Sequence, residues 1–290
     1  MRRPAPAAKR VSLGCTHLDS ASCMDQRIYS KVRSGVCAIG ALRVSQQEFI
    51  KAPDAPQFTI IGTGFLVRDT TVFTNRHVVL AVKAFAEKHR IPADRLYLQF
   101  NYGVARGHHQ QGWCRFGKHG FMSNQNLDIG VIEFVRRPEP SFAVCQPLDV
   151  VENLEIPIGV AVAALGFPYG TSAQQRETGA GEKIYRFGPV LQQGYLSAIA
   201  PFDEANRAER LLLDVRTSGG MSGSPVFLPD SGEVIGILDA GIEDTIAFAI
   251  PLTRARIEGI LRLHDETPIG TVRGSPVATV PRRPNHKGVA

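Results

Sequence analysis

Three residues in this chain have the types needed for acyl-transfer chemistry at a hydroxyl group. Ser222 lies in the stretch GGMSGSPVF, among glycines and directly ahead of an apolar run. A serine hydroxyl is a poor nucleophile unless a base removes its proton, so Ser222 requires a histidine and a group that orients it. His77 in TNRHVV and Asp128 in NLDIGVIEF could fill these two roles. Together the three would supply a nucleophile, a general base and an orienting carboxylate.

The local context of each residue agrees with such a role. His77 follows a predicted strand at the point where a helix starts, so it can be exposed on one side and packed on the other. Asp128 opens an apolar strand, and a carboxylate at that edge costs free energy to bury unless it is paired. An imidazole N–H is a natural partner for it. The glycines around Ser222 allow its backbone to turn tightly and approach another chain closely.

The first half of the chain predicts a β-rich unit over residues 28–150. The expected strands cover 32–44, 58–67 (two strands joined by a glycine bend), 72–75, 96–100 and 128–135. Apolar residues at helical spacing after His77, followed by Ile-Pro, predict a short helix that ends near Pro92. Residues 101–126 are rich in glycine and histidine and are expected to be irregular.

The second half predicts a similar unit, over about 155–250, followed by a C-terminal helix at 252–264. Its six expected strands cover 159–167, 190–199, 210–215, 225–228, 233–240 and 245–250. Two sets of six short strands, with helices only after His77 and at the end, predict an all-β fold of two six-stranded antiparallel β-barrels. The two halves share no residue-level repeat, so the duplication is architectural.

The bulk composition excludes several classes of protein. A chain of 290 residues buries enough surface to fold without disulfides. Its five cysteines are odd in number and form no CxxC pair, so neither a disulfide framework nor a zinc site is indicated. The histidines at 108, 109 and 119, with Cys114, fit no zinc spacing either, and we expect no metal and no cofactor.

Charge and targeting features are also informative. The net charge of +6 is concentrated in the two ends, 1–27 and 265–290, which are expected to be disordered. No aromatic residues interleave these charges, so they give no indication of nucleic-acid binding. No apolar run has membrane-spanning or signal-peptide length, which predicts a soluble, cytoplasmic protein.

The motifs taken together resemble the trypsin/chymotrypsin-like serine peptidase superfamily, and most of all its bacterial HtrA-type and related trypsin-like branch. TNRHVV, NLDIGVIEF and GGMSGSPVF resemble that branch's histidine, aspartate and serine motifs, in the same order. LGFPYG (165–170) and IAFAIPL (246–252) resemble two further motifs. The resemblance covers residues 28–264, and no PDZ-like domain is expected after it.

The resemblance implies a serine endopeptidase that hydrolyses polypeptides through an acyl-enzyme intermediate, with its site in the cleft between two barrels. Ser222 would be the nucleophile, His77 the general base and then acid, and Asp128 the group that fixes the histidine tautomer. The N–H groups of Gly220 and Ser222 would form the oxyanion hole. Met221 stands where digestive relatives carry aspartate, so activation by N-terminal cleavage is not expected.

A second hypothesis is a protease-fold binding or chaperone module with little turnover. The intact His-Asp-Ser set favours the enzyme. An activating protein partner that orders the loops is compatible with either hypothesis, and the sequence does not indicate an oligomeric state.

The resemblance also implies a substrate-binding set. This set comprises Arg216, Thr217, Leu238, Ala240 and Gly241. Arg216 would lie at the pocket base, which argues against cleavage after Lys or Arg and could favour an acidic side chain by charge pairing. Two readings oppose the acidic preference: Leu238 replaces the histidine of glutamate-specific relatives, and Arg216 could turn to solvent. The segment 238–241 resembles the family's edge strand that pairs with substrate backbone. Asp239 within it is unusual and has no role in this interpretation.

Overall fold

The fold is described from a computed structural model. The structure describes residues 24–45, 48, 57–104, 108–121, 127–134, 144–169, 173–177, 183–201, 208–242 and 246–266. Residues 1–23 and 267–290, which make up most of the arm and tail expected to be disordered, lie outside the described residues.

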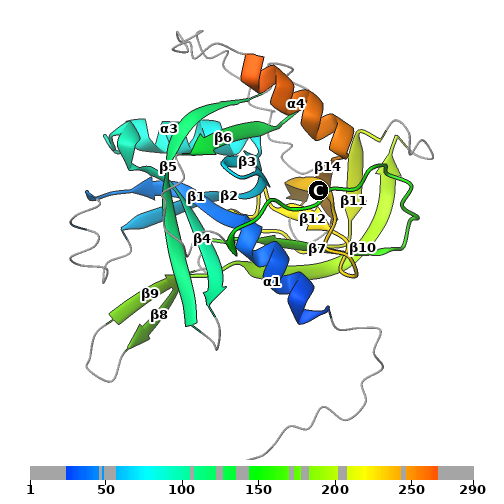
Figure 1. Ribbon diagram of the computed structural model, residues 1–290, viewed down its shortest axis with the longest axis horizontal. Coiled ribbons are helices and arrows are strands. Elements are labelled where there is room, and N and C mark those ends of the chain that lie inside the picture. Colours follow the sequence, from blue (N-terminus) through cyan, green and yellow to red (C-terminus); the bar gives the residue numbers. More distant parts are fainter. Residues whose placement is uncertain are drawn as a thin grey trace, which may run out of the picture.

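The first barrel closes from six antiparallel strands in the order β1-β2-β3-β6-β5-β4 (Figure 1). These strands are β1 (Val36–Leu42), β2 (Phe58–Arg68), β3 (Thr71–Thr74), β4 (Leu96–Val104), β5 (His108–Phe121) and β6 (Gly130–Phe134). Helix α3 (Arg76–Lys88) follows β3 and buries Val78, Val79 and Val82 on one face, as predicted from the spacing after His77. A single 3-10 turn, η1 (Ala93–Arg95), leads into β4.

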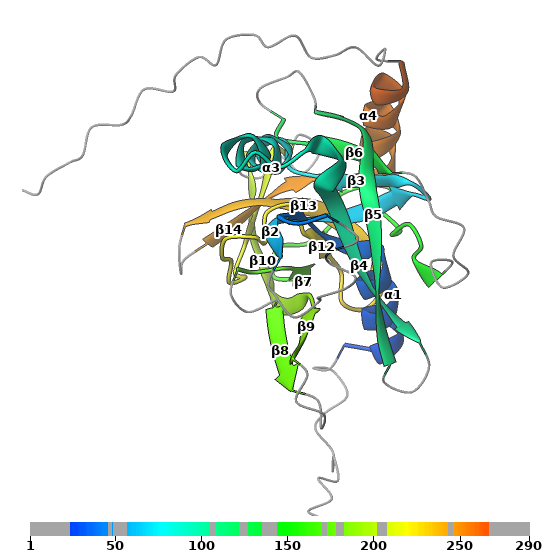
Figure 2. The same ribbon diagram turned by 90° about the vertical axis from the view of Figure 1, so that its left-hand side faces the viewer.

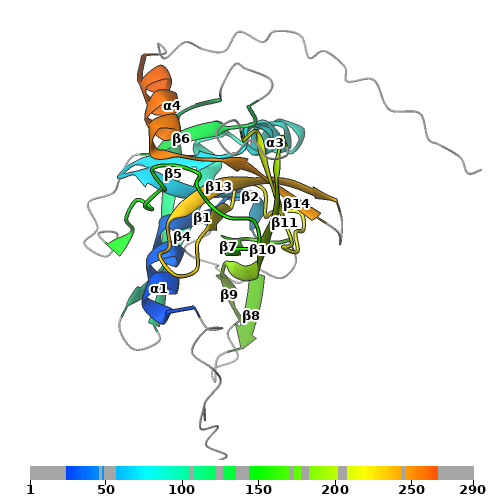
Figure 3. The same ribbon diagram turned by 90° about the vertical axis from the view of Figure 1, so that its right-hand side faces the viewer.

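The second barrel has six antiparallel strands in the order β10-β11-β14-β13-β12-β7. These strands are β7 (Ala161–Gly166), β10 (Val190–Ala200), β11 (Arg210–Leu213), β12 (Pro225–Phe227), β13 (Val234–Ile242) and β14 (Ile246–Pro251). The prediction of two six-stranded antiparallel barrels is therefore confirmed. An additional hairpin of β8 (Ala173–Glu177) and β9 (Lys183–Phe187), which the sequence analysis missed, extends from the barrels on the side opposite α4 (Arg254–Glu266) (Figures 2 and 3).

The predicted number of strands in the first barrel is correct, but two of the predicted strands are wrong: β5 was missed, and β2 was divided into two strands. Residues 101–104 and 108–121, expected to be irregular, form the end of β4 and all of β5. β5 pairs with β4 and, across a register shift, with β6, so its backbone groups are bonded despite many glycines. Conversely, β2 runs unbroken through Gly62. The pairing with β1 shifts register beside it, between Ile60 and Gly62, without ending the strand. A Cβ at Gly62 would lie 2.5 Å from Val78, so glycine also permits α3 to approach the strand.

Helix α1 (Gln26–Gly35) precedes β1 where a disordered arm and then a strand from residue 32 were expected. Asp25 caps the helix by accepting a hydrogen bond from the amide of Arg27 at 2.7 Å. Val32 is buried in the core, and Ile28 packs against it. The helical spacing of Ile28 and Val32 was not recognised, because a dense apolar run follows these residues and was assigned to a strand.

One of the buried hydrophobic clusters spans both barrels. Phe65 and Phe73 of the first barrel belong to the same buried cluster as Leu165 and Phe227 of the second. Helix α4 leaves the second barrel and reaches the first, where buried His264 contacts Glu133 of β6 at 3.1 Å. These contacts fix the barrels relative to one another, and groups on both sides of the seam can therefore be held at bonding distance.

Among the helices that the structure describes, none has the length and apolar character required to cross a membrane.

Candidate active site

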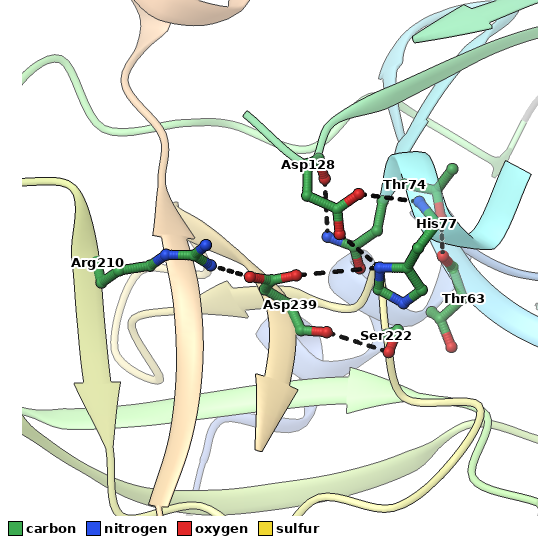
Figure 4. A network of polar contacts seen from close by, with 8 residues as sticks. Thr63, Thr74, His77, Asp128, Arg210, Ser222 and Asp239 are labelled. Atoms are coloured by element: carbon green, nitrogen blue, oxygen red, sulfur yellow. Dashed lines mark hydrogen bonds and ion pairs between the residues drawn. The ribbon is translucent and has the colours of Figure 1, made fainter. Parts of the chain in front are cut away.

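His77, Asp128 and Ser222 come from three separate elements that meet at the seam of the barrels (Figure 4). His77 is the second residue of α3, and Asp128 lies just before β6, so both belong to the first barrel. Ser222 lies in the turn just before β12 of the second barrel. Closure of the first barrel places Asp128 beside α3, because β3, which leads into the helix, pairs with β6.

The carboxylate of Asp128 holds His77 at two points. One oxygen accepts a hydrogen bond from the main-chain N–H of His77 at 2.9 Å. This N–H lies in the first turn of α3 and has no acceptor within the helix, so the carboxylate also caps the helix. The other oxygen lies 2.5 Å from Nδ1 of the imidazole. The main-chain oxygen of Asp128 accepts from the amide of Arg76 at 3.3 Å, which locks the two segments together. With Nδ1 as donor, Nε2 carries a lone pair and can accept a proton.

Asp128 is held in its charged form. Burial by itself raises the pKa of this carboxyl, but the hydrogen bonds and charge of His77, with the charge of Arg210, outweigh that effect and lower the pKa below its ordinary value. A permanent negative charge beside Nδ1 favours the tautomer with the proton on that nitrogen.

Ser222 is in a resting orientation. Its hydroxyl donates to the main-chain oxygen of Asp239 at 3.2 Å, and within the described part of the chain it makes no hydrogen bond with His77. The imidazole ring lies between Asp128 and Ser222 (Figure 4). Catalytic hydrogen bonds are often unformed before substrate binds. Transfer of a proton from this hydroxyl to His77 would require the hydroxyl to rotate from Asp239 toward the imidazole.

The backbone ahead of Ser222 is arranged to present amide groups. The carbonyl of Gly219 accepts from the amide of Tyr169 at 2.7 Å. Because a trans peptide points its C=O and N–H in opposite directions, the N–H of Gly220 faces away from Tyr169. Gly220 has φ of +93°, and a Cβ there would lie 2.3 Å from the carbonyl oxygen of Phe167, so only glycine fits. Neither Gly220 nor Ser222 donates its amide to an acceptor among the described residues.

Thr63 of β2, which the sequence analysis did not single out, clamps this segment from the other barrel. Its amide donates to the carbonyl of Ser222 at 2.9 Å. Its hydroxyl donates to the carbonyl of Gly220 at 2.7 Å and accepts from the amide of Phe167 at 2.9 Å. Thr63 is fully buried, so water cannot replace these bonds. The sequence signal was weak, because a threonine in a strand is ordinary.

Replacing Thr63 by valine keeps the shape but leaves the Gly220 carbonyl and the Phe167 amide buried without these bonds. We expect unfolding to become easier by about 2–4 kcal/mol, measured by urea denaturation. We also expect any turnover that uses Ser222 to slow by up to about 10²-fold, because the segment that carries Gly220 loses its anchor. Thr59→Val on the same strand is the matched control. If Thr59→Val lost as much stability and activity as Thr63→Val, the proposed role of the Thr63 hydroxyl would be contradicted.

A pocket of about 270 Å³ opens beside Ser222. Its lining comprises Thr217, Ser218, Gly219, Met221, Ser222, Leu238, Asp239 and Gly241. Three of the predicted substrate-binding residues, Thr217, Leu238 and Gly241, thus line it. Arg216 is exposed and is absent from the lining, which agrees with the reading in which it turns to solvent. Ala240 lies in β13, paired with Phe248.

Asp239 joins the site in a way that the sequence did not predict. One of its carboxylate oxygens lies 4.0 Å from Nδ1 of His77, and the other forms an ion pair with Arg210 of β11. The sequence contained one indication of a role for Asp239: an aspartate is unusual inside an apolar strand such as EVIGILDA. It did not identify Arg210 or His77 as its partners.

A metal ion is not indicated by this arrangement. Ligand atoms of His77, Asp128 and Asp239 lie within 4.8 Å of one another. However, Nδ1 of His77 is committed to Asp128, and Asp239 is committed to Arg210. The cluster noted in the sequence, His108, His109, His119 and Cys114, lies on β5. Cys114 is buried, and His119 contacts the carbonyl of Gly117 at 2.9 Å.

Comparison with known proteins gives matches over most of the chain. The family model described as a trypsin-like peptidase domain matches residues 62–237. Glutamyl endopeptidase of Staphylococcus aureus strain MW2 is 24% identical over 230 residues, covering 74% of this chain and 59% of that protein. The protein of the same name from strain MRSA252 is 23% identical over 205 residues, covering 68% and 47%. The chain thus spans less than two thirds of the length of these relatives.

Two solved structures are also similar. The crystal structure of Deg5 has 18% identity and a TM-score of 0.48, with coverage of 81% of this chain and 90% of that chain. The active form of the Rv3671c protease from M. tuberculosis has 16% identity and a TM-score of 0.49, with coverage of 90% and 93%.

Proposed function

The chain belongs to the family of trypsin-like peptidase domains, and we propose that it is a serine endopeptidase with Ser222, His77 and Asp128 as its catalytic triad. The observation that carries this proposal is the contact of 2.5 Å between Asp128 and Nδ1 of His77, at a barrel seam that also holds Ser222. It supplies an oriented base beside a hydroxyl, which is what a serine nucleophile requires.

In the proposed reaction, Ser222 attacks the carbonyl carbon of a peptide bond while its hydroxyl proton passes to Nε2 of His77. The carbonyl oxygen becomes an oxyanion, which accepts hydrogen bonds from the amides of Gly220 and Ser222. His77 then gives its proton to the leaving amine, the C–N bond breaks, and an acyl-enzyme remains. Water enters, gives a proton to His77 and attacks the ester, and the acid product leaves as Ser222 regains its proton.

Each role has support in the geometry. Asp128 is charged and lies against Nδ1, so it stabilises the imidazolium that forms in each half of the reaction. The amides proposed for the oxyanion hole have no acceptor among the described residues, so they are available to substrate. The bond from Thr63 to the Gly220 carbonyl restrains the same segment in advance of the reaction.

We also propose that the side chain ahead of the cleaved bond is uncharged. The relatives named glutamyl endopeptidase point toward acidic substrates, but in this chain Arg216 lies outside the pocket lining. Asp239 is the one charged residue of that lining, and it is already paired with Arg210. An acidic side chain would find no cation in that lining, and a basic one would find no free carboxylate.

A peptide library incubated with the purified chain tests both proposals, with products identified by mass spectrometry. We expect cleavage after neutral side chains by wild type and none by Ser222→Ala. Predominant cleavage after Glu, Lys or Arg would overturn the pocket argument while leaving the enzyme proposal intact. Binding of peptides without cleavage would instead support the protease-fold binding module.

A further inference from the structure

Resting on the proposed function, we propose that Asp239 is a positioning residue. It is a second carboxylate for His77 that, restrained by Arg210, sets the pH at which the base gains its proton.

The first support is the placement of Asp239 between the other members of the site. It lies on β13 and is only 8% exposed. Its carboxylate faces the same imidazole nitrogen as Asp128, at 4.0 Å against 2.5 Å. Its main-chain oxygen accepts the hydroxyl of Ser222. One residue therefore contacts the nucleophile through its backbone and the base through its side chain (Figure 4).

The second support is the ion pair with Arg210. A carboxylate this deeply buried requires a partner, and Arg210 supplies it from β11, which β14 separates from β13 in the barrel. The pair leaves the other oxygen of Asp239 facing His77. Arg210 also acts on Asp128. Burial raises the pKa of that carboxyl and His77 lowers it, and the charge of Arg210 adds to the lowering.

The charged groups in contact with this part of His77 therefore come from three elements: Asp128 before β6, Asp239 on β13 and, through Asp239, Arg210 on β11. When His77 takes the proton of Ser222, the ring becomes positive and both carboxylates stabilise it. Arg210 opposes this effect and offsets one of the two negative charges. Because Arg210 also holds Asp239 back, Asp128 remains the group that accepts the hydrogen bond from Nδ1–H of His77.

The test is the acid limb of the pH profile of kcat/KM, which reports protonation of the base in the free enzyme. Asp239→Asn removes a negative charge and should move the limb about 1 pH unit lower, as expected for a unit charge near a half-exposed ring. Arg210→Gln leaves the charge of Asp239 uncompensated and should move the limb higher by a similar amount. The double variant should return toward wild type.

Two surface variants control for net charge. Asp149→Asn and Arg254→Gln change the total charge by the same amounts, but Asp149 pairs with Lys31 and Arg254 with Glu152 away from the site. The acid limb should not move in either. A purely structural role for Asp239 would lower activity without shifting the limb.

A second readout does not depend on turnover. In the Ser222→Ala protein, an NMR titration of the His77 imidazole should show the same opposite displacements for Asp239→Asn and Arg210→Gln. If wild type cleaves no peptide but these displacements appear, the proposed function fails and the role of Asp239 stands. If the His77 imidazole titrates in the folded variants as it does in the Ser222→Ala protein, the proposal is overturned. It is also overturned if Asp239→Asn and Arg210→Gln displace the titration in the same direction.

Discussion

Ser222→Ala, His77→Ala and the variant carrying both substitutions are expected to lower kcat for peptide hydrolysis by about the same factor, on the order of 10⁶. The two residues act as one unit, because the hydroxyl is a nucleophile only while the imidazole takes its proton. Once either residue is lost, removing the other should lower the rate no further. Rates for the single and double variants on one peptide, measured side by side, check this expectation.

Covalent labelling gives an independent readout of the same unit. A fluorophosphonate forms a P–O bond with an activated serine oxygen and releases fluoride, so wild type should label and Ser222→Ala should not. Ser224→Ala is the matched control. The hydroxyl of Ser224 donates to the carbonyl of Met221 at 2.6 Å, and that carbonyl keeps the amide of Ser224 as a second donor. Labelling of Ser222→Ala, or a double variant much slower than either single one, would contradict the assigned unit.

Asp128→Asn has the second largest expected effect, a fall in kcat of about 10⁴-fold with the fold retained. The asparagine oxygen can still accept the amide of His77, now at 2.9 Å from Asp128, so the start of α3 remains capped. Its amide group, however, would face Nδ1 as a donor and force the ring proton onto Nε2. The base would then have no lone pair for Ser222. Circular dichroism checks the fold, and steady-state kinetics check the rate.

The same substitution should change how stability depends on pH. The folded-state pKa of Asp128 is lowered, so its contribution to stability is present above the unfolded value of about 4 and is lost as pH falls through the folded value. Asp128→Asn lacks this contribution, and the difference in unfolding free energy from wild type should shrink as acid is added below that range. Asp149→Asn, which removes the exposed partner of Lys31, is the control for the loss of one surface carboxylate. A constant difference across acid pH would contradict the account.

Much of the architecture follows from local sequence patterns. The six strands of the second barrel begin and end within two residues of the predicted ends, because each is a short apolar run between turn residues. The helix after His77 and the C-terminal helix follow from apolar spacing. β5 does not, because its glycines and histidines carry no strand signal and only its pairing with β4 and β6 makes it a strand.

The sequence by itself determined which residues could react: a serine among glycines, a histidine at a helix start and an aspartate at a strand edge. Only the tertiary structure decided how they are held. The clamp of Thr63 on Gly220 and the restraint of Asp239 by Arg210 join residues from different strands. The physical reason is that a hydrogen bond or ion pair between distant segments depends on barrel closure and strand register. No local pattern encodes either of these.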